Sequence, residues 1–304
     1  MEQTAKNNSV KEFFADIIRG VGIGVAFIIP GFSGGSVAAI LGIYEKLICA
    51  IADIFKDFKK SFKTLLPIAI GMIVGIISLL FPLSWALEEF PIPTVSLFVG
   101  LAVGGMPSIT DKVKGERISY KNLIASVIPA VVVLSISFMP IGADKNLLNL
   151  SFGGYVLLFL VGILGSAALV VPGISGSMLL LILGYYNPIV NLATDHLLVG
   201  KDIGISILIL GVTAAGIAIG FLLISVIMKM LFKKCPRGTY FSIIGFIIGS
   251  IPTIYISTVK EAGMTLSTLP TSVFHWIACV LLLCAGFALS YFLVIYSRKK
   301  TLKK

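Results

Sequence analysis

The chain has 304 residues, of which 57% are hydrophobic and 12% are charged. Soluble domains carry about 25% charged residues, so this composition excludes an ordinary soluble fold and predicts an all-α polytopic membrane protein. The net charge of +10 does not indicate a nucleic-acid partner, because the basic residues lie in short loops and at both ends of the chain, where they orient membrane proteins.

Apolar runs define the elements expected along the chain. Two apolar segments, 17–51 and 155–190, are interrupted by proline and glycine, and each is followed by three uninterrupted runs. These runs approach or exceed the roughly 20 residues that cross a bilayer, and they carry no acidic or basic side chain. The expected transmembrane helices are 65–81, 93–109, 122–141, 203–228, 240–257 and 273–296. No cleavable signal sequence is expected, because the first apolar run breaks at Pro30 without a small-residue cleavage site.

The two halves of the chain repeat each other. Segment 29–35 (IPGFSGG) matches segment 171–177 (VPGISGS), and the match continues from ILGIY to ILGYY without a gap. Paired glycines also correspond, and these are Gly71 and Gly75 with Gly216 and Gly220, and Gly100 and Gly104 with Gly245 and Gly249. The sequence therefore predicts an N-terminal segment (1–16), a first repeat (17–142), a second repeat (153–297) and a basic tail (298–304).

The charges predict how the interrupted segments meet the membrane. If each segment is a re-entrant helical hairpin, each repeat crosses the bilayer three times, and the second repeat is inverted. All Lys and Arg residues except Lys145, Lys201 and Lys260 then lie on the cytoplasmic side, as the positive-inside rule requires. We therefore expect an inverted repeat of six transmembrane helices plus two re-entrant hairpins in the bacterial inner membrane, with both termini cytoplasmic.

The motif Pro-Gly-x-Ser-Gly predicts an anion site at the tip of each hairpin. Pro30 and Pro172 end the first limbs, and Ser33 and Ser175 are expected to cap the returning helices. A helix N-terminus offers free amide hydrogens that favour phosphate, and two hairpins from opposite faces would bring their tips together. The expected phosphate-binding residues at the tips are Gly31, Ser33, Gly34, Gly35, Ser36, Gly173, Ser175, Gly176 and Ser177. The alternative is that these small residues only permit close helix packing.

Charged side chains beside the first hairpin distinguish it from the second. Arg19 and Glu45 have uncharged residues at the matched positions 161 and 187. Because an ionisable group within a membrane is costly, we expect Arg19 to hold an anionic head group, and Glu45 to pair with Arg19 or carry a coupling proton. The alternative is that Arg19 snorkels to the interface. Tyr44 and Tyr186 are expected either to line the site or to pack at the interface.

No metal or cofactor is expected. The four cysteines form no C-x-x-C pair, which argues against a zinc site or a disulfide framework. There is no Walker sequence, so a coupling ion, either a proton or sodium, or the membrane potential is the expected energy source rather than ATP.

These motifs resemble a known family. Arg19-Gly20, segment 30–35, segment 41–46 and segment 172–176 are similar to the PopT-type polyprenyl-phosphate transporters of bacteria, formerly a domain of unknown function. The resemblance covers essentially the whole chain, and it implies return of undecaprenyl phosphate from the outer to the inner leaflet for reuse in envelope polymers. Family members often carry Asp before the first Pro-Gly, where this chain has Phe27 and Ile28, whereas Ser36 keeps the hydroxyl of the family's Thr.

Two other functions compete with lipid transport. Gly31-Phe32-Ser33-Gly34 and its repeat look like the Gly-x-Ser-Gly of intramembrane serine hydrolases, but such a serine needs a base within hydrogen-bond reach. The two histidines, His196 and His275, are expected at the outer surface, so a non-enzymatic transporter is favoured. A carrier for a small soluble anion would use the same tips and differ only in being closed to membrane lipids.

Overall fold

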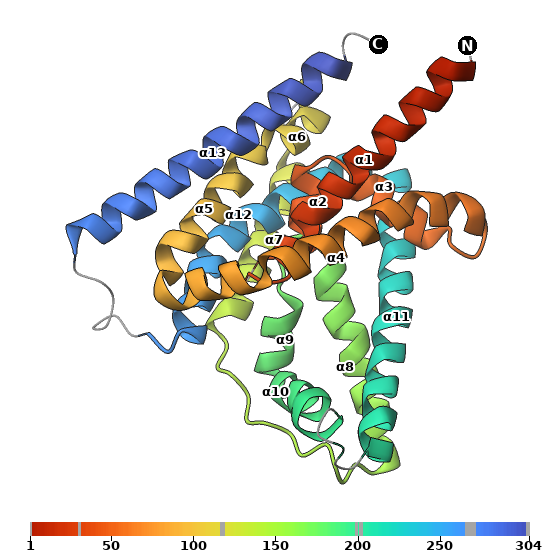
Figure 1. Ribbon diagram of the computed structural model, residues 1–304, viewed down its shortest axis with the longest axis vertical. Helices are drawn as coiled ribbons and strands as arrows, with labels where there is room; N and C mark the ends of the chain where they lie inside the picture. The colour runs from red at the N-terminus through yellow and green to blue at the C-terminus, as the bar shows by residue number, and fades with distance from the viewer. Residues whose placement is uncertain are drawn as a thin grey trace.

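The computed structural model describes residues 2–29, 32–115, 119–197, 200, 203–264 and 272–301, and for residues 2–9, 169, 195–197 and 296–301 it describes the backbone alone. The secondary structure of these parts is helical, which confirms the predicted all-α class (Figure 1). Six described helical segments are long and apolar enough to cross a membrane, and each matches one predicted run. They are α4 (Phe58–Glu89), α5 with α6 and η1 (Pro91–Val113), α7 (Tyr120–Phe138), α11 (Ile203–Lys234), α12 (Pro236–Glu261) and α13 (Val273–Thr301). Five of them contain the whole run, whereas α7 ends at Phe138, three residues before the end of the predicted run 122–141.

The helices pack in four close pairs. α1 (Glu2–Ala26) lies against α4, and α8 (Phe152–Val170) lies in the same way against α11 (Figure 1). The second span of each half pairs with the last span of the other half, α5 with α13 and α12 with α7. In the apolar stretches of the spans, more than half of the residues of α5 and α12 are buried, against fewer than a quarter in the other four spans. α5 and α12 are therefore the central helices, and the others present most of their apolar side chains outward.

The glycines matched between the two halves occupy equivalent helix crossings. A Cβ atom added at Gly71 would overlap the carbonyl oxygen of Ile17 in α1, and one added at Gly216 would overlap that of Phe159 in α8. Small residues of this kind let helix backbones touch in a membrane, where van der Waals contact drives association. Gly71 and its counterpart Gly216 therefore both permit close helix packing.

Each interrupted segment contains two breaks, whereas the sequence indicated one. The first segment forms α1, α2 (Gly34–Ile40) and α3 (Tyr44–Ala52). The second forms α8, α9 (Gly176–Ile182), α10 (Tyr186–Asn191) and η2 (Leu192–Leu197). Pro30 and Gly31, predicted to make the first break, lie outside the described residues.

The additional breaks are glycine-terminated helix ends. Gly42 and Gly184 have φ of +71° and +75°, a left-handed conformation that glycine adopts without steric cost. Around Gly42, the amide of Ile43 donates to the carbonyl of Ala38 at 2.9 Å, which completes a Schellman motif. After the same turn in the second half, α10 leaves α9 at 107°. Each short helix thus ends in a glycine turn at the matched Leu-Gly-x-Tyr sequences.

Candidate functional site

The first breaks of the two segments are capped as the sequence predicts. Ser33 precedes α2 in an extended conformation, and its side-chain oxygen accepts a hydrogen bond from the amide of Gly35 at 3.2 Å. Ser175 precedes α9 in the same way and accepts from the amide of Met178 at 3.3 Å. An N-cap oxygen satisfies amide groups that have no partner within the helix. The predicted capping roles of Ser33 and Ser175 are therefore confirmed.

The two first breaks touch each other inside the protein. The amide of Gly173 donates to the Ser36 hydroxyl oxygen at 2.7 Å, and the Ser33 hydroxyl donates to the carbonyl of Val171 at 3.4 Å. Ser36 is fully buried and Ser33 is 3% exposed. Segments 138 residues apart in the chain thus meet through hydrogen bonds between the breaks, as the repeat led us to expect.

Several of the predicted phosphate donors bind each other in this conformation. Ser175 and Ser177 share a hydrogen bond of 3.0 Å between their hydroxyl oxygens. Gly34, Gly35 and Gly176 are buried in the first turns of α2 and α9. The structure therefore brings the described members of the predicted set together in a closed polar centre, where backbone and hydroxyl groups satisfy one another.

Tyr44 belongs to this centre, and its matched partner has a different setting. The Tyr44 hydroxyl donates to the carbonyl of Val170 at 3.1 Å, and the side chain is 4% exposed. Tyr44 therefore joins the start of α3 to the last residue of α8, directly before the first break of the second segment. Tyr186 begins α10 and is half-buried.

A buried carboxylate that sequence reasoning missed lies beside the first segment. Asp16 of α1 is 3% exposed, and it accepts from Arg19 at 2.8 Å and from Lys46 of α3 at 2.6 Å. The sequence placed Asp16 at the end of the N-terminal segment and gave it no role. Its spacing of three residues from Arg19 was the available signal, because such residues share one face of a helix.

The partner expected for Arg19 was Glu45, and the structure gives each of them another. Arg19 pairs with Asp16, and Glu45 accepts a hydrogen bond from the Tyr240 hydroxyl of α12 at 2.8 Å. The reason is geometric, since Asp16 lies one turn from Arg19 on the same helix, whereas Glu45 lies in the first turn of α3 within hydrogen-bond reach of Tyr240.

Helix α3 is held by polar contacts to three different helices. Lys46 binds Asp16 in α1, and Glu45 binds Tyr240 in α12. Asp53, which caps the C-terminal end of α3, forms an ion pair with Lys229 of α11. These three contacts hold α3, the second short helix after the first tip, against α1, α11 and α12.

The geometry offers little support for a serine hydrolase. The described partners of Ser33 and Ser175 are backbone groups and Ser177. His275 lies on α13 beside Trp276, and its buried Nε2 has no hydrogen-bond partner among the described residues. A base must lie within hydrogen-bond reach of its nucleophile, and the structure brings His275 to neither serine. The side chain of His196 lies outside the described residues.

Comparisons with known proteins likewise favour a transporter over a hydrolase. The family model described as undecaprenyl phosphate translocase-like matches residues 23–269. The polyprenyl-phosphate transporter of Staphylococcus aureus is 30% identical over 280 residues, which cover 90% of this chain and 94% of the relative. The polyprenyl-phosphate transporter of Vibrio cholerae is 26% identical over 258 residues, which cover 80% and 78%. No solved structure matches.

Proposed function

Because the chain belongs to the undecaprenyl phosphate translocase-like family, we propose that it carries undecaprenyl phosphate from the outer to the inner leaflet of the bacterial cytoplasmic membrane. This step would return the lipid carrier for another round of cell-envelope synthesis. The observation that carries the proposal is the contact between the two chain breaks, in which Ser36 holds the amide of Gly173. Many transporters with repeated halves bind their substrates where broken helices meet at the interface between the two repeats.

The proposed mechanism opens this centre alternately to the two leaflets. When the breaks separate, the hydrogen bond between the Gly173 amide and the Ser36 hydroxyl breaks. Both groups then donate hydrogen bonds to the oxygens of the lipid phosphate. The isoprenoid tail stays in the lipid, so the protein opens sideways and need not form a closed aqueous channel. Arg19 supplies positive charge beside the path once Asp16 releases it. Glu45, with Tyr240 as its partner, is the proposed site of a coupling proton or sodium ion.

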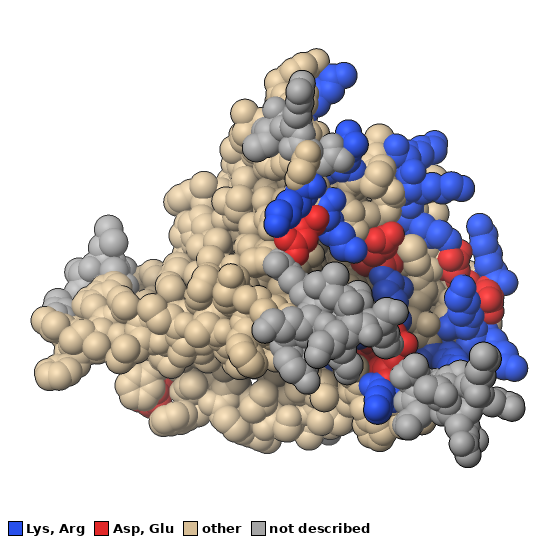
Figure 2. Space-filling model, turned by 90° about the horizontal axis from the view of Figure 1, so that it is seen from above, with Lys and Arg blue, Asp and Glu red and all other residues tan. Residues whose placement is uncertain are grey.

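The proposed topology makes both interrupted segments re-entrant and the two repeats inverted, with both termini in the cytoplasm. Figure 2 supports it, because Lys and Arg gather on one side of the face shown while most of the rest of that face is uncharged. A single basic side is what the positive-inside rule requires of a polytopic protein.

Cysteine labelling tests this topology. In a variant without native cysteines, a membrane-impermeant maleimide should label Lys145→Cys in intact cells and Lys59→Cys only after lysis. Both lysines are exposed, so access to the thiol depends on the side of the membrane. Labelling of Lys59→Cys in intact cells would show that the first interrupted segment is not re-entrant. The proposed inverted repeat would then be wrong as well.

Lipid transport by the purified protein tests the function directly. Proteoliposomes with the wild-type chain should move labelled undecaprenyl phosphate between leaflets, and Arg19→Ala should lower the rate about tenfold, since a hydrogen bond to a charged group contributes ~1.5–3 kcal/mol. Lys11→Ala removes an exposed charge from the same helix and should leave the rate within about twofold. Passage of phosphate ions without lipid movement would favour the soluble-anion carrier, and hydrolysis of the lipid would favour an enzyme.

A further inference from the structure

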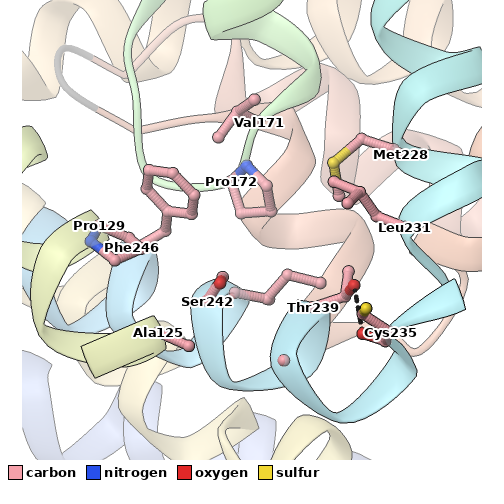
Figure 3. A pocket seen from close by; sticks show the side chains of 12 residues that line it. Ala125, Pro129, Val171, Pro172, Met228, Leu231, Cys235, Thr239, Ser242 and Phe246 are labelled. Carbon is pink, nitrogen blue, oxygen red and sulfur yellow. Dashed lines mark hydrogen bonds between the residues drawn. The ribbon is translucent and has the colours of Figure 1, made fainter. Parts of the chain in front are cut away.

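An open groove leads from the break at Pro172, the first break of the second segment, toward the end of α11. It has a volume of about 360 Å³ and lies between α7, α11 and α12. Figure 3 shows Pro129 and Phe246 on one side of the hollow, Met228 and Leu231 on the other, and Pro172 between them. Its walls are therefore mainly apolar, and its inner end is the proline of the break itself.

The groove has few polar side chains, namely the hydroxyls of Thr239 and Ser242 and the thiol of Cys235. The Thr239 hydroxyl donates to the carbonyl of Cys235 at 2.8 Å, within its own helix (Figure 3). Gly238 lines the wall with no side chain, and a Cβ atom placed on it would meet no other atom within 4 Å. Such a wall suits a hydrocarbon chain, because burying apolar surface is favourable and most of the lining side chains are apolar.

The outer end of the groove is basic. Lys233 and Lys234 lie in the last turn of α11, and Arg237 follows at the start of α12, on either side of the lining residue Cys235. An apolar groove that ends in a cluster of positive charge complements a molecule with a hydrocarbon chain and an anionic head. The same pattern places the head group at a membrane surface and the chain toward the membrane interior.

We infer that this groove holds the isoprenoid chain of a polyprenyl phosphate, with the phosphate at the basic turn 233–237 and the chain directed toward Pro172. The inference rests on the proposed function and adds to it a docking place for the lipid in one leaflet, separate from the polar centre. Gly238 then sets the width of the groove, and the lipid leaves the protein between α7 and α11.

Filling the groove tests this assignment through transport. Gly238→Leu adds a side chain to the open groove without meeting a neighbour, and it should lower transport of undecaprenyl phosphate at least fivefold. The matched control is Gly211→Leu in α11, an exposed position that also has nothing within 4 Å and is not in the groove. Its transport should stay within about twofold of wild type. Equal transport by the two variants would overturn the inference while leaving the proposed function intact.

Labelling of Cys235 gives a readout that does not depend on transport. In a Cys49→Ser, Cys284→Ser variant, Cys235 is the exposed thiol, since Cys279 is 7% exposed. Undecaprenyl phosphate should slow its reaction with maleimide at least threefold, and phosphatidylglycerol at the same concentration should not. Equal protection by both lipids, or by neither, would contradict a polyprenyl-phosphate groove. If undecaprenyl phosphate protects Cys235 but the wild-type protein does not transport it, the assignment of the groove stands and the proposed function is wrong.

Discussion

Gly173→Ala should reduce lipid transport at least thirtyfold while the protein remains folded. Gly173 has φ of +86°, and an added Cβ atom would overlap the carbonyl oxygen of Phe246 in α12. The left-handed conformation costs an L residue roughly 1–2 kcal/mol, and displacement of the amide from Ser36 costs about another 1–3 kcal/mol. Transport per folded protein, with folding checked by size-exclusion chromatography, measures the effect.

Two further variants separate the contact from the backbone strain. Gly115→Ala places alanine at a similar φ of +83° with nothing within 4 Å, so it carries the conformational cost alone and should transport normally. Ser36→Ala removes the acceptor of the Gly173 amide and leaves the backbone conformation unchanged, so it should also impair transport. If Gly173→Ala behaved like Gly115→Ala, the contact between the two breaks would not be part of the transport site.

Asp16→Ala should cause the largest loss of stability among single side-chain removals at the polar contacts of α3. It leaves Arg19 and Lys46 facing each other without the carboxylate that now joins them. Breaking a fully buried pair costs about 3–5 kcal/mol; here we expect roughly 2–3 kcal/mol, because the side chains of Arg19 and Lys46 are 31% and 36% exposed and are partly screened by solvent. Thermal unfolding in detergent would show this loss as a lowered midpoint.

A control variant and a double-mutant cycle assign the loss of stability to the ion pair between Asp16 and Lys46. Glu12→Ala removes a carboxylate on the same helix that is 3.8 Å from Lys46 and 68% exposed, and it should cost no more than about 0.5 kcal/mol. Lys46→Met combined with Asp16→Ala should be less destabilising than the sum of the two single changes. Each single change leaves one charge of the pair without its partner, and the double change removes both charges. Strict additivity would mean that Asp16 and Lys46 do not stabilise each other.

The transmembrane helices were predictable because each one follows from a local property. A run of apolar residues long enough to cross the bilayer identifies α4, α7, α11 and α13 without knowledge of their neighbours. The N-caps at Ser33 and Ser175 were predictable for the same reason, since a cap contacts amides two or three residues further along the chain.

The internal repeat extended prediction to some distant contacts. Because the motif occurs twice, both halves were expected to break at equivalent places and to bring those breaks together, and the bond between Ser36 and Gly173 agrees. The second break of each segment was missed, although Gly42 and Gly184 occupy matched positions. A glycine among apolar residues reads equally well as part of a continuous membrane helix, so its backbone conformation had to come from the structure.

By itself, then, the sequence determined the class of protein, its six apolar spans and the duplicated broken segments, since hydrophobicity and helix ends depend on neighbouring residues. Only the tertiary structure decided which charges pair, that α3 is held by three helices, and that an apolar groove adjoins Pro172. Asp53 and Lys229 are 176 residues apart, and nothing in either local sequence indicates the other. Such contacts depend on how the helices are placed in space, because side-chain interactions act over a few ångströms whatever the separation along the chain.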